Sequence, residues 1–272
     1  MADTESRFDR DTTIQDLGKG VFEARIDRGW WIVRGPNGGY LAALLLRALQ
    51  AAVDDPERLP RSLTVHYLRP PSEGEAQIET TLERQGRSLT TATARLVQGG
   101  KLHAIAISAF SKAREALEFQ HAEMPPAEPP ETLEPMPRVI NEMVPFRQRF
   151  EERWAIGARP WEGGPKAVSG GWIRPVEPHA IDAPMVTALT DAWPPAVFSY
   201  AEMGTIPGGV PTVDLTVHFR APLPPPGSGE HDWVLAVFRS REARQGFVEE
   251  DGEIWSRGGV LLAQSRQLAV VG

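Results

Sequence analysis

The chain has 272 residues, 41% hydrophobic and 24% charged, a globular composition that excludes a disordered or fibrous protein. Its net charge of −7 argues against nucleic acid as the main partner, because binding phosphates requires a basic face. The absence of cysteine excludes disulfides, thiolate metal sites and a cysteine nucleophile. No apolar run reaches the roughly 18 residues of a membrane span, and the acidic first residues are not typical of a signal peptide, so we expect a cytoplasmic protein with no membrane partner.

The first third of the chain predicts a strand region, a buried helix and four strands. Residues 22–33 have strand character around a turn, and a glycine-rich break at 35–39 precedes an apolar helix. Between Gly38 and Val53 only Arg47 is charged, so this helix should be buried on nearly all sides. Short turns rich in glycine separate the strands that follow and favour antiparallel pairing. These strands are predicted at 62–69, 75–84, 89–98 and 102–110.

A proline-rich stretch follows the last of these strands. Seven prolines lie between Met124 and Pro145, with acidic residues among them. Proline fixes φ and removes a hydrogen-bond donor, so this stretch cannot form a helix or a central strand. We predict an extended linker over residues 116–145 that runs across the surface.

The last third of the chain repeats the order of the first. A strand near 172–175 precedes a helix that Asp182 can cap, with Pro184 in its first turn. This helix is predicted to run to about Ala192, where Pro194 and Pro195 interrupt it. The strands that follow are predicted near 212–220, 232–241, 244–250 and 258–270.

Two short sequence matches indicate that the chain contains a duplicated unit. Residues 62–67 read SLTVHY and residues 214–219 read DLTVHF, 152 positions apart, and each is followed by a proline stop. A second pair of Gly-Gly turns before an apolar strand, at 99–100 and 258–259, keeps the same order. Each unit is a helix enclosed by an antiparallel sheet, so the predicted fold is an α+β double hot-dog. We expect an N-terminal hot-dog over 1–115, the linker, and a C-terminal hot-dog over 146–272.

Several motifs in this order resemble the double hot-dog acyl-CoA thioesterases, close to the bacterial type II enzymes. The similarity extends from about residue 15 to the end of the chain. It implies hydrolysis of acyl-CoA to CoA and a carboxylic acid, in a family that needs no cofactor. The matching stretches are NGGY at 37–40, LRP at 68–70, FQH at 119–121, GWIR at 171–174, TDAWPPA at 190–196, PTVD at 211–214 and QSRQL at 264–268.

The resemblance implies one active site in which an Asp, a Thr and a Gln hold a water. The family's positions fall on Asp191, Thr212 and Gln267. Asp191 would be the general base, and its alternative interpretation is a residue at a helix end that reaches solvent. Thr212 starts a strand whose alternation directs it away from the apolar face, so a bulge or twist would have to redirect it. Gln267 lies among small side chains that leave room for a ligand, although it could also be a surface amide.

The thioester oxygen needs hydrogen-bond donors, and the backbone of Gly38 and Gly39 at the start of the first helix could provide them. These glycines could equally serve only the turn. The first repeat has Ser108 where the second has Gln267, and it has no Asp near its helix end before Asp54. We therefore expect a single catalytic set, built mainly in the second repeat.

Other chemistries find little support in the sequence. No G-x-S-x-G elbow provides a serine nucleophile, and the six histidines lack metal-ligand spacing. Two alternatives stay open at this point. One is a non-catalytic acyl-CoA-binding protein of the same fold, and the other is a hot-dog hydratase, although the helix-borne Asp-His pair of that class is not evident. Whether the chain forms a homo-oligomer of double hot-dogs is also open.

Overall fold

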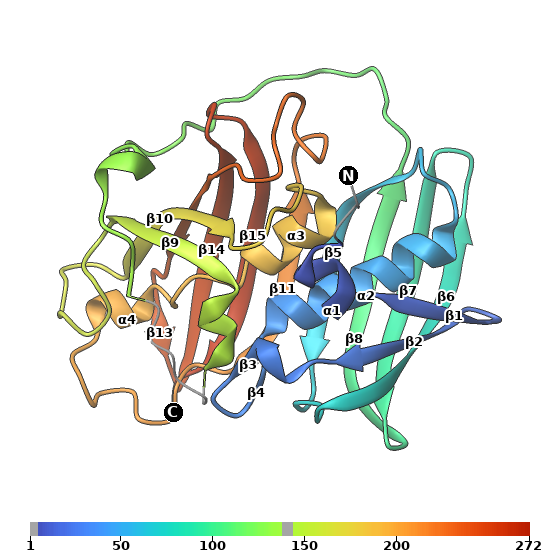
Figure 1. The fold of residues 1–272 in the computed structure, drawn as a ribbon, viewed down its shortest axis with the longest axis horizontal. Coiled ribbons are helices and arrows are strands. Elements are labelled where there is room, and N and C mark those ends of the chain that lie inside the picture. Colours follow the sequence, from blue (N-terminus) through green and yellow to red (C-terminus); the bar gives the residue numbers. More distant parts are fainter. Residues whose placement is uncertain (1–4, 138–143) are drawn as a thin grey trace.

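A long antiparallel sheet curves around two helices in the computed structural model, which describes residues 5–137 and 144–272 (Figure 1). The sheet has the strand order β1-β2-β6-β7-β8-β5-β11-β15-β14-β12-β10-β9, with β13 paired to β14. The helices are α1 (Arg7–Asp11), α2 (Gly38–Val53), α3 (Ala183–Leu189) and α4 (Val197–Tyr200). The strands are β1 (Ile14–Gly18), β2 (Val21–Ile26), β3 (Trp31–Ile32), β4 (Gly35–Pro36), β5 (Leu59–Tyr67), β6 (Gly74–Gln85), β7 (Leu89–Gln98), β8 (Lys101–Ser111), β9 (Phe150–Ile156), β10 (Val168–Pro175), β11 (Thr212–Phe219), β12 (Val234–Arg239), β13 (Ala243–Arg244), β14 (Phe247–Ser256) and β15 (Leu261–Val270).

The two repeats meet where β5 pairs with β11 in the middle of the sheet. Thr64 lies opposite Thr216, and the two hydroxyls are 3.0 Å apart. These two residues occupy the same position in the repeated sequence, so a pseudo-two-fold axis passes between them. The pairing is symmetric about this axis. Ser62 pairs with His218, and their counterparts in the repeat, Asp214 and His66, pair with each other. The predicted equivalence of these strands is confirmed.

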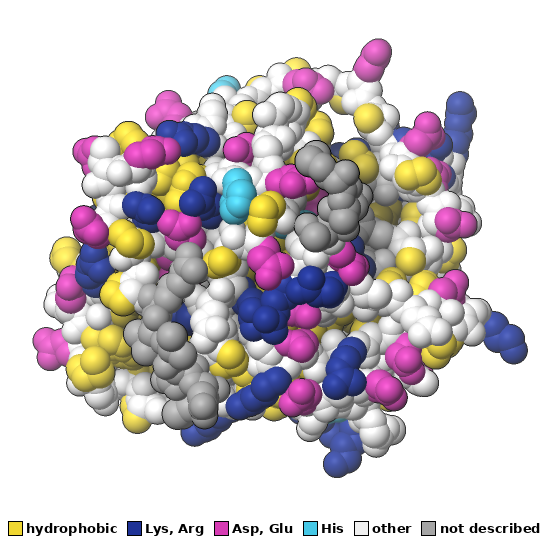
Figure 2. Space-filling model, in the orientation of Figure 1, with side chains coloured by type: hydrophobic (Ala, Val, Ile, Leu, Met, Phe, Trp, Pro, Cys, Tyr) yellow, Lys and Arg dark blue, Asp and Glu magenta, His cyan; other side chains and the backbone are white. Residues whose placement is uncertain are grey.

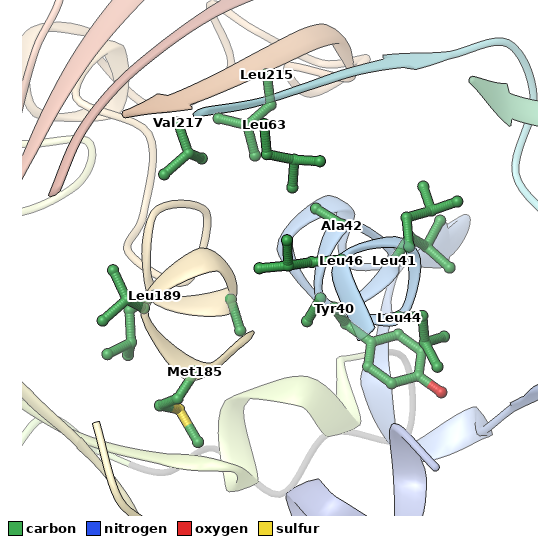
Figure 3. Packing of buried hydrophobic residues seen from close by; sticks show 14 of the residues in the cluster. Tyr40, Leu41, Ala42, Leu44, Leu46, Leu63, Met185, Leu189, Leu215 and Val217 are labelled. Carbon is green, nitrogen blue, oxygen red and sulfur yellow. The ribbon is translucent and has the colours of Figure 1, made fainter. Parts of the chain in front are cut away.

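The core lies between this sheet and the two helices. Figure 3 shows Leu63, Leu215 and Val217 pointing from β5 and β11 toward α2 and α3. The face of β11 that carries Leu215 and Val217 is fully buried, as the alternation of the sequence predicts. α2 is buried along most of its length because it has sheet on one side and α3 on the other. The predicted α+β double hot-dog is therefore correct.

The proline-rich segment is extended and packs on the outer face of the second half of the sheet. Residues 112–129 contain no helix or strand, and residues 138–143 lie outside the described part of the chain. The indole N–H of Trp172 donates to the Glu128 carbonyl at 2.7 Å, and Met124 packs against the buried cluster around Trp172. This segment thus covers apolar strand residues that would otherwise face water. The domain boundaries at 115 and 146 stay a prediction, because the sheet continues across both halves.

Charges of both signs are mixed over the face of the molecule in Figure 2. The basic side chains at its centre lie over α1, where Arg7 pairs with Asp11 at 3.1 Å and Arg47 pairs with Asp9 at 2.7 Å. Such pairing leaves little net positive field for a phosphate backbone on this face. In the part of the chain that the structure describes, no helix combines the length and apolar character needed to cross a bilayer.

Candidate active site

Asp191 lies in the turn that follows α3, where it faces the N-terminus of α2. The helix ends at Leu189, earlier than the sequence predicts, so Asp191 is outside it and partly buried. Its Oδ2 accepts hydrogen bonds from the Gly39 amide and from Asn37 Nδ2, both at 2.9 Å. This carboxylate of the second repeat is therefore held by the N-terminus of α2 in the first repeat.

Asn37 links the two repeats at this point and is only 1% exposed. Its Oδ1 accepts from the Tyr40 amide at 2.9 Å and caps α2, as asparagine commonly does. Its Nδ2 donates to the backbone carbonyl of Asp191 at 2.7 Å as well as to the carboxylate. The NGGY motif includes Asn37, but the sequence analysis assigned it no role. An asparagine before a helix is typical of an N-cap. The sequence gives no sign of its second partner, Asp191, because that residue is 154 positions away.

Two opposing effects set the acidity of Asp191. Burial raises its pKa from 3.8 to about 6, because a charged carboxylate loses solvation there. Hydrogen bonds from the α2 amides and from the side chains of Gln267 and Asn37 favour the ionised form and limit the rise. A carboxylate with a pKa near 6 is ionised at neutral pH and can still accept a proton effectively.

Thr212 and Gln267 meet next to Asp191. Thr212 Oγ1 donates to Gln267 Oε1 at 3.0 Å, and the Gln267 side chain lies close enough to Asp191 to lower the pKa of that carboxyl. The β11–β15 register shifts between Thr212 and Asp214, so the first strand residue is displaced from the regular alternation. The sequence predicts a bulge or twist here, and this register shift is such an irregularity, which allows Thr212 to reach Gln267. The three candidate residues thus come together.

Glu250 is a further buried carboxylate in this cluster that the sequence analysis did not find. It lies on β14 directly opposite Gln267 and is 6% exposed. Gln267 Nε2 donates to its Oε1 at 2.8 Å, and the Ala196 amide donates to its Oε2. Burial raises its pKa to about 7, and the nearby charge of Asp191 adds to the rise. Alternation along Glu249, Glu250 and Asp251 gives no sign of which acid turns inward.

The two glycines at the start of α2 allow the repeats to approach closely. A Cβ at Gly39 would lie 2.6 Å from the Ala188 carbonyl, and one at Gly38 would lie 2.9 Å from Asp191 Oδ2. The Gly39 amide is engaged by Asp191, while the Gly38 carbonyl accepts from Tyr67 Oη at 2.8 Å. Binding of a substrate oxygen by these glycines stays a prediction. Tyr67, whose pKa is raised by burial and by the charge of Asp191, closes this side of the cluster.

The pseudo-two-fold axis relates this cluster to a cavity of about 500 Å³ at the opposite ends of α2 and α3. There Pro60 takes the position of Thr212, and Phe219 takes that of Tyr67. Ser108, the counterpart of Gln267, donates to the Ser62 carbonyl. Thr13, Gln50 and Asp182 also line this cavity. Because Pro60 and Ser108 stand where the first cluster has Thr212 and Gln267, the hydrogen bond between that hydroxyl and that amide is not repeated there.

Metal chemistry has no candidate donors in the part of the chain that the structure describes. No group of three or more His, Asp or Glu side chains is placed to hold an ion in residues 5–137 and 144–272. His66 and His218 occupy equivalent strand positions on either side of the axis, as the repeat predicts.

Comparison with known proteins agrees with this fold and extends over nearly all of the chain. The chain is 28% identical to a hot-dog protein of unknown function from Alicyclobacillus acidocaldarius, with a TM-score of 0.87 over 98% of each chain. It is 20% identical to an acyl-CoA thioesterase II from Mycobacterium marinum, with a TM-score of 0.73 over 97% of this chain and 98% of that one. An uncharacterized protein of Mycobacterium tuberculosis is 26% identical over 92% of this chain and 91% of its own length.

The family assignment rests on sequence models of the two halves. Residues 27–111 match the model of the acyl-CoA thioesterase N-terminal domain, and residues 123–271 match that of the C-terminal domain. The chain therefore belongs to the double hot-dog acyl-CoA thioesterases, enzymes that hydrolyse thioesters.

Proposed function

We propose that this thioesterase hydrolyses acyl-CoA with a water activated by Asp191 and positioned by Thr212 and Gln267. The observation that carries the proposal is the convergence of these three side chains: Thr212 hydrogen-bonds Gln267, and Gln267 lies beside Asp191, whose pKa it lowers. A carboxylate with a pKa near 6 supplies a proton acceptor, and the hydroxyl, held by the amide, supplies a ligand for the water.

In the proposed reaction the water oxygen attacks the thioester carbon while Asp191 takes one of the water protons. The carbonyl becomes a tetrahedral oxyanion, then reforms as the C–S bond breaks. The CoA thiolate leaves and recovers the proton from Asp191, so the products are a carboxylic acid and CoA. Asp191 thus returns to its ionised state at the end of each turnover.

The N-terminus of α2 supports stabilisation of the oxyanion in this proposal. Its first amides, at Gly38 and Gly39, and its positive helix dipole lie beside the proposed base. The Gly39 amide donates to Asp191 in the resting site. When Asp191 accepts the water proton, its charge no longer competes for this amide, and the developing oxyanion becomes the stronger acceptor.

Asp191→Asn tests the base directly. The amide keeps the size of the side chain and an oxygen for Gly39, but it cannot accept the water proton. We expect kcat for acyl-CoA to fall about 10²- to 10⁴-fold with little change in KM. Thermal stability should hold or rise, because the fold raises the pKa of Asp191 and so disfavours its ionised form at neutral pH.

The measurement is release of free CoA thiol from a series of acyl-CoAs of increasing chain length. The control is Asp251→Asn, which should leave kcat unchanged. Asp251 is next to Glu250 in the chain, but its carboxylate pairs with Arg266 at 2.7 Å, outside the cluster. Thr212→Val and Gln267→Ala should each cost less than Asp191→Asn. If Asp191→Asn keeps more than half of the wild-type kcat, Asp191 is not the base. Absence of turnover with every acyl-CoA would favour a binding protein.

A further inference from the structure

The charge of Glu250 has a directional effect on its neighbours. Above its pKa of about 7 Glu250 is ionised, and an ionised carboxylate can only accept hydrogen bonds, so Gln267 must then present Nε2 to it across the β14–β15 pair. The other end of the same amide, Oε1, must then face Thr212. Thr212 in turn has to donate its only hydroxyl hydrogen to Gln267, which leaves its oxygen lone pairs free.

A neutral side chain at position 250 would satisfy the same backbone group at a lower desolvation cost. Glutamine could accept from the Ala196 amide through its oxygen and donate to Gln267 through its nitrogen. The protein instead buries a second carboxylate close to Asp191, although the charge of Asp191 raises the pKa of Glu250. The hydrogen bond from the Ala196 amide therefore does not explain why this residue is an acid, because glutamine could accept the same bond. The acid is explained by the direction that its charge imposes on the hydrogen bond from Gln267.

We propose that Glu250 is a positioning residue that sets the direction of the hydrogen-bond chain from Thr212 through Gln267, and thereby the orientation of the nucleophilic water. The inference rests on the proposed function above. With Thr212 donating to Gln267, its oxygen accepts one hydrogen from the water while Asp191 accepts the other. The lone pair of the water is then left to face the thioester carbon.

Glu250→Gln reverses this chain without changing the size of the side chain. Its oxygen keeps the Ala196 amide, and its NH₂ group requires Gln267 to rotate and present Oε1. Thr212 then faces the NH₂ of Gln267, accepts a hydrogen bond from it and turns its own hydrogen toward the water. We expect kcat to fall about 10- to 100-fold, with KM within about twofold and an unchanged or higher Tm.

Glu250→Asp provides the opposite test, because it keeps the charge and the direction but shortens the side chain. We expect it to retain more kcat than Glu250→Gln, whereas a purely structural role would favour the isosteric, neutral glutamine. Glu253→Gln is the matched control: it lies three residues further along β14, pairs with Arg239 at 3.2 Å and does not contact Gln267. Its kcat should equal that of the wild type.

The double variant Glu250→Gln/Gln267→Ala shows whether Glu250 acts through Gln267. We expect its kcat to equal that of Gln267→Ala alone, because the chain is already broken. The inference is overturned if Glu250→Gln keeps more than half of the wild-type kcat, if it exceeds Glu250→Asp, or if its loss persists in the Gln267→Ala background. Should Gln267→Ala itself leave kcat unchanged, the proposed function fails first, and Glu250 loses its role with it.

Discussion

Asp191 occupies a position in which its surroundings act on its charge in opposite directions. The start of α2 favours the carboxylate through the Gly39 amide and the helix dipole, while burial disfavours it. Burial alone would leave more of the acid in its neutral form, and the hydrogen bonds alone would make it a weaker base. The pKa of about 6 results from both effects acting on one side chain.

Asn37→Asp should move the acid limb of the activity profile. In the wild type, kcat/KM should rise with pH with a midpoint near 6, because the ionised form of Asp191 is the active one. An aspartate at 37 still accepts from the Tyr40 amide, but it places a second carboxylate where Asn37 Nδ2 lies 2.9 Å from Asp191. The pKa of Asp191 should rise further, and the midpoint should move to higher pH.

Asn37→Ser is the comparison for this variant, since it keeps a helix cap and adds no charge. It should lose activity, because Asp191 is no longer held, without moving the midpoint upward. The profile is measured as thiol release between about pH 5 and pH 9. An unchanged midpoint in Asn37→Asp would mean that Asp191 does not limit the reaction at low pH.

At the site, the family motif predicts Asp191, Thr212 and Gln267, and these three residues do lie together, with a register shift at Thr212 where a bulge or twist was expected. Residues that act through contacts carry no such signal. Glu250 follows another glutamate, so only the β14–β15 register shows that it faces Gln267. Asn37 reads as a cap because the sequence does not show that the turn after α3 returns to it.

Among the elements, the contact between α2 and α3 determines where Asp191 lies. The helices cross where Gly39 meets the Ala188 carbonyl, which leaves no room for a methyl group. Because Asp191 follows α3 by only two residues, any shift of that helix moves the carboxylate relative to the α2 amides. If Asp191 is the base as proposed, Gly39 therefore affects catalysis through the spacing of the helices.

Gly39→Ala should reduce both stability and activity. The added Cβ would lie 2.6 Å from the Ala188 carbonyl and 3.0 Å from Asp191 Cβ, so α3 must move. We expect a loss of about 1–3 kcal/mol in unfolding free energy, typical of overpacking, and a fall in kcat. Gly258→Ala is the control, because its Cβ would have only Ser256 Oγ within 4 Å, at 3.9 Å. Equal melting temperatures for the two variants would show that the helices tolerate separation.

Elements with strong periodicity were predicted closely, and those that depend on their neighbours were not. The predicted helix and four strands of the first repeat match α2 and β5 to β8 within about three residues. The second helix was predicted to run to about Ala192 but ends at Leu189. The first helix-breaking residues in the sequence after its first turn are Pro194 and Pro195, whereas the chain already turns at Thr190 and Asp191. α1, α4, β1 and β9 were missed: both helices are very short, and both strands lie at the ends of the sheet order.

At the scale of the whole molecule, the two halves are joined by more than the polypeptide. β5 and β11 pair through the ladder around Thr64 and Thr216, and Asn37 reaches across to Asp191. The linker packs on the C-terminal half through Trp172 and Arg257, the latter paired with Glu131 at 2.7 Å. The linker segment around Leu117 is different, since that side chain is 88% exposed.

A chain cut at this exposed segment should stay assembled and active. A protease site introduced near Leu117 would allow the folded protein to be nicked without breaking any strand of the sheet. We expect unchanged elution in size-exclusion chromatography and kcat within about twofold of the intact protein. Separation into two fragments, or loss of turnover on nicking, would mean that the covalent connection is what holds the repeats together.

The pseudo-two-fold axis between Thr64 and Thr216 also gives this chain a freedom that a symmetric pair of identical subunits lacks. In a homodimer every substitution appears in both related places at once. Here Phe219 can stand where the other half has Tyr67, and Pro60 where the other half has Thr212. An engineer could therefore redesign the second cavity for a new ligand one residue at a time, leaving Asp191, Thr212 and Gln267 untouched.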